Sequence, residues 1–173
     1  GGAADDHETV SEAQAVARVR QGMGAMMRLG SAWHDVQAQI TAITQRGLDP
    51  AGFMLCTDDS HAGTLVHDGH MDRVVRHAVD CGCDPLVAIQ MATINTARHF
   101  GVERELGSIT PGRRADVVLT SDLRALPVEM VVAQGRLVAE GGRLLVDCPR
   151  IDWPDSARNS VHLGRVLTAA DFR

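Results

Sequence analysis

The pattern of apolar and polar residues divides the chain into a part with helical periodicity and a part with strand-like alternation. Up to about residue 100, apolar residues recur every three or four positions, whereas from Leu106 onward the period falls to about two. The first part also contains a short continuous apolar run from Phe53 to Cys56, which predicts a buried strand because it is too short for a helix. We therefore expect an α/β unit followed by a small β unit.

Helices are predicted in four segments of the first part. The apolar spacing places them at approximately residues 9–29, 33–46, 71–81 and 85–100. The first begins with a capping-box pattern, in which the Thr9 hydroxyl and the Glu12 carboxylate satisfy free amides, and Gly30 is placed to cap its end. The last begins at Asp84-Pro85, a helix cap followed by proline at the first helical position.

Four short strands are predicted in the second part. They lie at approximately residues 115–119, 128–133, 136–139 and 143–146. Gln134-Gly135 and Gly141-Gly142 supply turns between them. Residues 148–173 show neither periodicity, so we expect a linker or the start of a further region there.

Composition and charge exclude several classes of partner. The formal net charge is −5, and no run of basic residues resembles a nucleic-acid surface. No apolar stretch reaches the roughly 18 residues of a membrane span, so we expect no membrane partner. The four cysteines are scattered, which does not suit a disulfide framework and favours a reducing, cytoplasmic location. Cys81-Gly82-Cys83 lacks a second pair at zinc-site spacing, so a glycine-capped helix end is the better interpretation.

Two acidic clusters that contain histidine are the candidates for chemistry. Asp58, Asp59 and His61 follow the predicted strand at Phe53, and Asp6-His7-Glu8 precedes the first predicted helix. Loops that follow parallel strands open at the same edge of a sheet, which is where functional side chains converge. Imidazole and carboxylate are suitable ligands for a divalent transition metal. The sequence therefore predicts a metal site formed by these two loops.

Structural roles remain open for the same residues. Asp58 or Asp59 could cap a turn or the next helix, and the acidic residues before the first helix could act only on its dipole, with His7 exposed. The remaining histidines lack carboxylates at ligand spacing and are predicted to lie on the surface or in loops: His34, His67, His70, His77, His99 and His162.

Over residues 5–147, the sequence resembles the adenine deaminases of the amidohydrolase superfamily. The resemblance lies in five segments, residues 6–8, 53–59, 69–72, 88–95 and 106–116. The last segment, with the pattern Gly-x-Ile-x-Pro-Gly-x-x-Ala-Asp, is typical of the whole superfamily, whereas Asp-His-Glu and Cys-Thr-Asp-Asp point to the adenine branch.

This resemblance implies the carboxyl-terminal portion of a metal-dependent (β/α)8 TIM barrel in residues 1–103, and part of a small composite β-sandwich in residues 104–147. His7 would be the metal ligand after strand six, and Asp58 would bind metal after strand eight and carry the proton of the hydrolytic water. Glu8, Asp59 and His61 would line the substrate site. The implied reaction is the hydrolytic deamination of adenine to hypoxanthine and ammonia in purine salvage, with manganese, iron or zinc as cofactor.

Several ligands of the family pattern have no counterpart in this chain. The His-x-His after strand one, the bridging carboxylate after strand four and the histidine of strand five are missing. We therefore expect part of a longer enzyme that is inactive alone and either forms a homo-oligomer or associates with the rest of the barrel. The alternatives are another amidohydrolase, resembling dihydroorotases or N-acetyl-sugar deacetylases, and a noncatalytic fragment.

Overall fold

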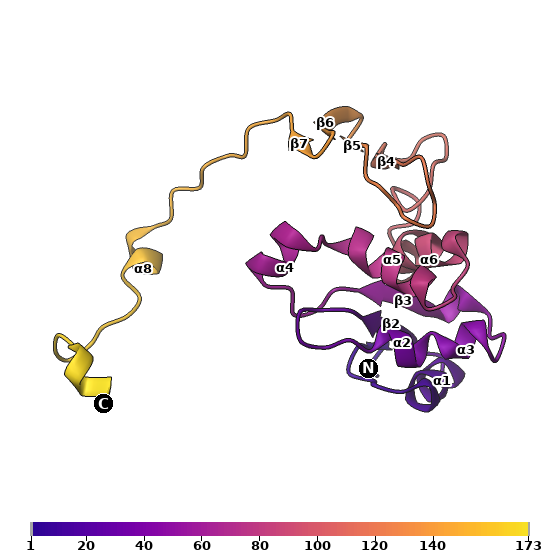
Figure 1. Cartoon of the computed structure of the whole chain (residues 1–173), viewed down its shortest axis with the longest axis horizontal. Coiled ribbons are helices and arrows are strands. Elements are labelled where there is room, and N and C mark those ends of the chain that lie inside the picture. The colour runs from indigo at the N-terminus through magenta and orange to yellow at the C-terminus, as the bar shows by residue number, and fades with distance from the viewer. Residues whose placement is uncertain (1, 173) are drawn as a thin grey trace.

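Three parallel strands form the centre of the first part of the chain. The computed structural model, which describes residues 2–172, contains β1 (Asp5–Asp6), β2 (Gly24–Arg28) and β3 (Phe53–Cys56) in that order, with β2 paired to both neighbours (Figure 1). Because the strands are parallel, their carboxyl ends lie at one edge of the sheet. The loops that follow them are therefore brought together.

Helices connect the strands and pack against the sheet. α1 (Glu12–Arg20) links β1 to β2, and the short helices α2 (Val36–Gln39) and α3 (Thr41–Thr44) link β2 to β3. A 3-10 turn, η1 (Pro50–Gly52), leads into β3. The helices that follow β3 are α4 (Ala62–His67), α5 (Met71–Asp80), α6 (Pro85–Ala92) and α7 (Ile94–His99).

The hydrophobic core lies between the sheet and these helices. Met27 of β2 and Phe53 of β3 are fully buried, as are Ile40 between α2 and α3 and Met91 of α6. Nearly all residues of β2 and β3 are buried, as expected for parallel strands that are covered on both faces. This packing fixes the strand ends that carry the polar residues.

The first predicted helix is too long, because residues 24–28 form β2. α1 ends at Arg20, and the positive φ of +80° at Gly22 takes the backbone out of the helical conformation. Gly30 therefore does not cap a helix. The alanine and methionines of β2 suit helical periodicity equally well, which is why the sequence pattern concealed the strand.

The predicted capping box is also wrong. The Ser11 hydroxyl accepts a hydrogen bond from the Gln14 amide at the start of α1, at 3.4 Å. The Thr9 hydroxyl instead donates to Gln39 Oε1 at 3.2 Å, and Glu12 binds Arg46 at 2.7 Å. Long-range partners have replaced the local ones. The fourth predicted helix is divided into α6 and α7 at Thr93.

The antiparallel strands of the second part are confirmed. β4 (Val117–Leu119), β5 (Met130–Ala133), β6 (Arg136–Glu140) and β7 (Arg143–Leu144) form one sheet in sequence order. Both residues of the turn Gln134-Gly135 have positive φ, as a two-residue hairpin turn requires, and the same holds for Gly141-Gly142. The molecule is thus α/β, as expected, with one parallel and one antiparallel sheet.

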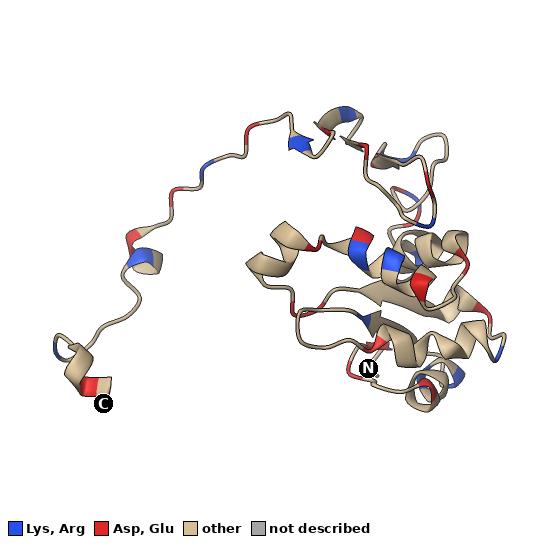
Figure 2. Ribbon diagram, viewed as in Figure 1, with Lys and Arg blue, Asp and Glu red and all other residues tan. Residues whose placement is uncertain are grey.

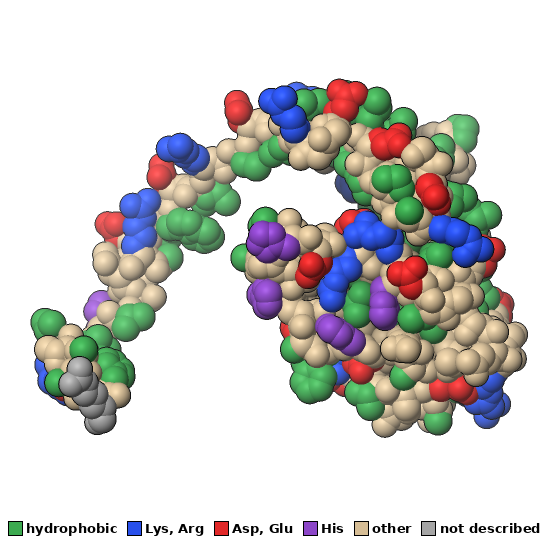
Figure 3. All heavy atoms as spheres, in the orientation of Figure 1, with side chains coloured by type: hydrophobic (Ala, Val, Ile, Leu, Met, Phe, Trp, Pro, Cys, Tyr) green, Lys and Arg blue, Asp and Glu red, His purple; other side chains and the backbone are tan. Residues whose placement is uncertain are grey.

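An extended segment follows the antiparallel sheet and leads away from the body of the molecule (Figure 1). It contains α8 (Asp155–Arg158) and the 3-10 turn η2 (Ala169–Phe172). Apolar side chains are exposed along it, including Ile151, Trp153 and Val166 (Figure 3). Basic and acidic residues are interspersed over the helices and this segment (Figure 2). None of the helices within residues 2–172 has the length and apolar character needed to cross a bilayer.

Candidate metal and active site

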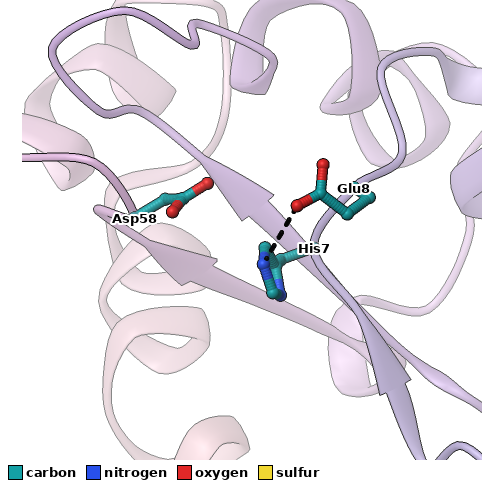
Figure 4. A group of neighbouring side chains, drawn as sticks. All are labelled: His7, Glu8 and Asp58. Carbon is teal, nitrogen blue, oxygen red and sulfur yellow. Dashed lines mark ion pairs between the residues drawn. The ribbon is translucent and has the colours of Figure 1, made fainter.

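The carboxyl ends of β1 and β3 bring three predicted site residues together. His7 and Glu8 follow β1, and Asp58 follows β3, with β2 between them (Figure 4). One potential ligand atom from each of the three lies within 4.8 Å of the other two, and His7 Nε2 is 3.3 Å from Glu8 Oε1. Two loops that are 50 residues apart in the sequence therefore contribute to one cluster.

The cluster lies at the surface of the described chain. The side chains of His7 and Glu8 are 48% and 71% exposed, whereas that of Asp58 is 28% exposed. Asp58 also has a positive φ of +54°. That conformation costs most residues about 1–2 kcal/mol, although aspartate tolerates it better than most. Backbone strain of this kind concentrates at functional sites.

Arg28, the last residue of β2, lies beside the cluster and connects its two carboxylates. Its Nη1 donates to Glu8 Oε2 at 3.0 Å and to Asp58 Oδ2 at 2.9 Å, while its Nε donates to Asp35 Oδ2 at 2.6 Å. The Arg28 side chain is only 4% exposed. Hydrogen bonds, first of all that to Asp35, raise its pKa above the ordinary value despite burial, so the guanidinium remains charged.

The loop after β2 encloses Arg28. The Asp35 amide donates to the Arg28 carbonyl at 3.0 Å, and an antiparallel bridge joins Leu29 to His34. The centroid of the Trp33 ring lies 5.1 Å from the guanidinium carbon, which suits a cation–π contact. Sequence reasoning missed Arg28, Trp33 and Asp35 because it placed residues 24–28 in the first helix and residues 33–35 in the second, whereas α2 begins only at Val36.

Asp59 lies outside the cluster and connects the loops after β2 and β3. Its Oδ2 accepts a hydrogen bond from the Ala32 amide at 2.8 Å, and its carbonyl accepts one from Ser31 at 3.2 Å. A Cβ at Gly30 would lie only 1.6 Å from Asp59 Oδ1. Gly30 is therefore required for the close approach of Asp59.

His61 lies next to this loop connection and caps α4. Its Nδ1 accepts a hydrogen bond from the Thr64 amide at 3.2 Å, and its own amide donates to the Ser31 hydroxyl at 3.0 Å. The structure thus brings His7, Glu8 and Asp58 together but gives Asp59 and His61 contacts within the surrounding loops.

Two further groups near the sheet have defined partners. Burial, followed by the charge of Asp58, raises the pKa of the Cys56 thiol to about 11, so the thiol is protonated at neutral pH. His99, predicted to be a surface residue, is only 17% exposed and lies 2.7 Å from Asp5 at the opposite end of the sheet.

The donor set suits a divalent transition metal. One imidazole and two carboxylates offer nitrogen and oxygen ligands, and their mutual distances are compatible with a single ion. Glu8 therefore becomes a possible ligand, in addition to its predicted place in the substrate site.

Comparison with known proteins gives one family match and a curated relative of high sequence identity. A model of the amidohydrolase family matches residues 8–138. The adenine deaminase of Paracoccus denitrificans (strain Pd 1222) is 80% identical over 172 residues, which are 99% of this chain but 29% of that protein. The chain therefore spans less than a third of the length of this curated relative.

Solved structures share the fold at low sequence identity. The β-aspartyl dipeptidase of Fervidobacterium islandicum AW-1 superposes with a TM-score of 0.59 at 14% identity, over 82% of this chain and 38% of that one. An adenosine deaminase from Xanthomonas campestris with bound zinc gives a TM-score of 0.50 at 18% identity, over 88% of this chain and 39% of that one.

Proposed function

Because the chain belongs to the amidohydrolase family, we propose that it is part of a metal-dependent adenine deaminase. The enzyme replaces the amino group at C6 of adenine with oxygen and releases hypoxanthine and ammonia, a reaction of purine salvage. The convergence of His7, Glu8 and Asp58 at the carboxyl edge of a parallel sheet is the observation that carries this proposal. The 80% identity to an adenine deaminase supports adenine as the substrate.

In this proposal, β1, β2 and β3 are strands six, seven and eight of a (β/α)8 barrel. Their parallel order and their connecting helices support the assignment. Residues 1–103 then belong to the barrel, residues 104–147 to a β-sandwich, and residues 148–173 to a further region. The free edges of β1 and β3 are suited to pairing with the rest of the barrel, and a homo-oligomer is the second form of assembly that we propose.

His7 and Asp58 would hold the metal, with Glu8 within reach as a third ligand. Manganese, iron and zinc all suit this mixture of nitrogen and oxygen donors. A bound divalent ion would supply Lewis-acid activation of water at neutral pH. Three donors from exposed loops form an incomplete site, so the isolated chain is expected to bind metal weakly and to be inactive.

The residues of this chain would move and direct protons. Asp58 uses only Oδ2 to bind Arg28, so Oδ1 can accept a proton from the hydrolytic water and deliver it to the substrate. The side chain of Glu8 is 71% exposed beside Asp58 and can contact the base. Asp59 and His61 would shape the substrate site by fixing the loops that border it.

Metal removal from the full-length protein tests this function. Treatment with a chelator is expected to abolish ammonia release from adenine, and manganese, iron or zinc should restore it. Dihydroorotate and an N-acetyl sugar serve as alternative substrates. The adenine assignment is wrong if the metal-loaded protein leaves adenine unchanged, and turnover of either alternative would identify a different amidohydrolase. A noncatalytic role would fit if none of the three is consumed.

A further inference from the structure

We propose that Arg28 is a positioning residue that fixes the carboxylates of Glu8 and Asp58 and leaves one oxygen of each for the metal or the reacting water. This role rests on the function proposed above and extends it to a residue outside the predicted ligand set.

Each of the two site carboxylates, Glu8 and Asp58, uses one of its oxygens to bind Arg28. Arg28 Nη1 binds Glu8 Oε2 at 3.0 Å and Asp58 Oδ2 at 2.9 Å. Glu8 Oε1 faces His7 Nε2 at 3.3 Å, and within residues 2–172 no protein donor hydrogen-bonds to Asp58 Oδ1. A single guanidinium nitrogen thus sets the spacing of two like charges that would otherwise repel each other.

Arg28 is itself held on two sides. Its Nε binds Asp35, a residue with a side chain that is only 12% exposed, and the Asp35 amide binds the Arg28 carbonyl. The Trp33 ring covers the guanidinium. Arginine binds Asp35 through Nε and the site carboxylates through Nη1, whereas lysine has only one terminal nitrogen. Lysine therefore cannot bind Asp35 and the site carboxylates in the same planar geometry.

The exposure of the partners argues for a role beyond stability. Arg28 is nearly buried, yet Glu8 is 71% exposed, and an ion pair with an exposed carboxylate typically contributes between 0 and about 1 kcal/mol. Asp35 alone would neutralise the buried charge. The additional contact to Glu8 therefore has its main effect on the orientation of that carboxylate, and the same guanidinium nitrogen also holds Asp58, which is 28% exposed.

Substitutions in the full-length protein test this role. Arg28→Lys keeps the charge, Arg28→Met removes it, and Arg46→Lys is the matched control because Arg46 binds Glu12 at 2.7 Å on a surface away from the cluster. Manganese affinity is measured by competition with a chelator, and kcat and KM are measured with adenine. Both Arg28 variants are expected to lose about 10- to 100-fold in manganese affinity and in kcat, with a smaller change in KM. Arg46→Lys should stay within twofold of wild type.

The result that overturns this role is a manganese affinity and a kcat within twofold of wild type in Arg28→Lys. If Arg28→Met does not fold, as circular dichroism would reveal, Arg28→Lys and Asp35→Asn decide the question. Asp35→Asn should cause a smaller loss of manganese affinity and kcat, because it weakens only the contact that holds Arg28 in place. If the wild-type protein does not deaminate adenine, the proposed function fails, whereas the manganese measurement still tests Arg28.

Discussion

The two ends of the parallel sheet use similar residues in different ways. At the amino end, polar groups hydrogen-bond to one another within the fold. His99 binds Asp5 at 2.7 Å, and the Asn95 amide donates to the carbonyls of Pro50 and Phe53. At the carboxyl end, one guanidinium is shared by three carboxylates. Of the remaining oxygens, Glu8 Oε1 faces His7 Nε2 at 3.3 Å, and Asp58 Oδ1 accepts no hydrogen bond from a protein donor within residues 2–172.

This difference separates polar groups that pair within the fold from those that we propose to take part in chemistry. A cavity of about 340 Å³ also lies at the amino end, where Gly24, Met54 and His99 are among its lining residues. The cavity at the amino end therefore does not identify the candidate site, which is marked by the cluster of His7, Glu8 and Asp58 at the other end. Substitutions at matched positions on the two ends should have different effects on activity.

The largest difference is expected between two aspartates that flank β3. Asp58→Asn removes the proposed proton acceptor after the strand, so kcat of the full-length protein should fall by about 10²- to 10⁴-fold. Asp49→Asn changes a residue before the strand that caps η1 through the Ala51 amide, and should leave kcat within twofold. Steady-state deamination of adenine measures both, and near-normal turnover by Asp58→Asn would remove Asp58 from the mechanism.

Two glycines at the ends of β2 give the next largest difference. Gly30→Ala places a methyl group 1.6 Å from Asp59 Oδ1, so the loops around Arg28 must move. We expect a loss of about 2–3 kcal/mol in the free energy of unfolding and a lower kcat. Gly24→Ala meets mainly the flexible end of Met54, and should cost about 1 kcal/mol with kcat unchanged.

Urea unfolding and adenine turnover test this pair together. Equal losses of kcat in the two variants would mean that the loop geometry at the carboxyl end has no special importance.

The smallest effect is expected at Asp72 of α5, which binds the His70 amide and Arg76 and lies outside the cluster of His7, Glu8 and Asp58. Burial tends to raise the pKa of Asp72, but hydrogen bonds from the His70 amide and Arg76 outweigh it and lower the pKa below the usual 3.8. The ionised form therefore stabilises the fold above pH 3.8, and this contribution is lost as the pH falls through the lowered pKa.

Asp72→Asn should accordingly destabilise the protein by on the order of 1 kcal/mol at pH 7, with kcat unchanged. The difference in unfolding free energy from wild type should shrink below pH 4, which urea titrations between pH 6 and pH 3 can follow. A difference that is independent of pH would rule out ionisation of Asp72 as its cause.

The sequence predicted β3 and the antiparallel strands, because their signals are local. Phe53 to Cys56 is a short apolar run bounded by polar residues, and paired glycine-containing turns mark the later strands. β2 gave no such signal, since a strand buried on both faces has no alternation and its alanine and methionines favour helices.

The candidate site was predictable only in part for the same reason. His7, Glu8 and Asp58 belong to polar clusters that the sequence shows directly after two strands. Arg28 was not predictable, because a single arginine within an apparent helix is usually solvated, and its burial depends on Asp35 and Trp33 folding back over it. The Thr9 contact with Gln39 likewise joins residues 30 positions apart, which no local pattern reveals.

The place of Arg28 on the middle strand has a consequence for folding. Successive side chains of a strand point to opposite faces, so a shift of β2 by one position against its neighbours would turn Arg28 away and present an apolar methionine or leucine to Glu8 and Asp58. Two acidic groups would then face each other without a counter-charge. Repulsion between Glu8 and Asp58 therefore disfavours a misaligned sheet. This effect requires neither a bound metal nor a substrate.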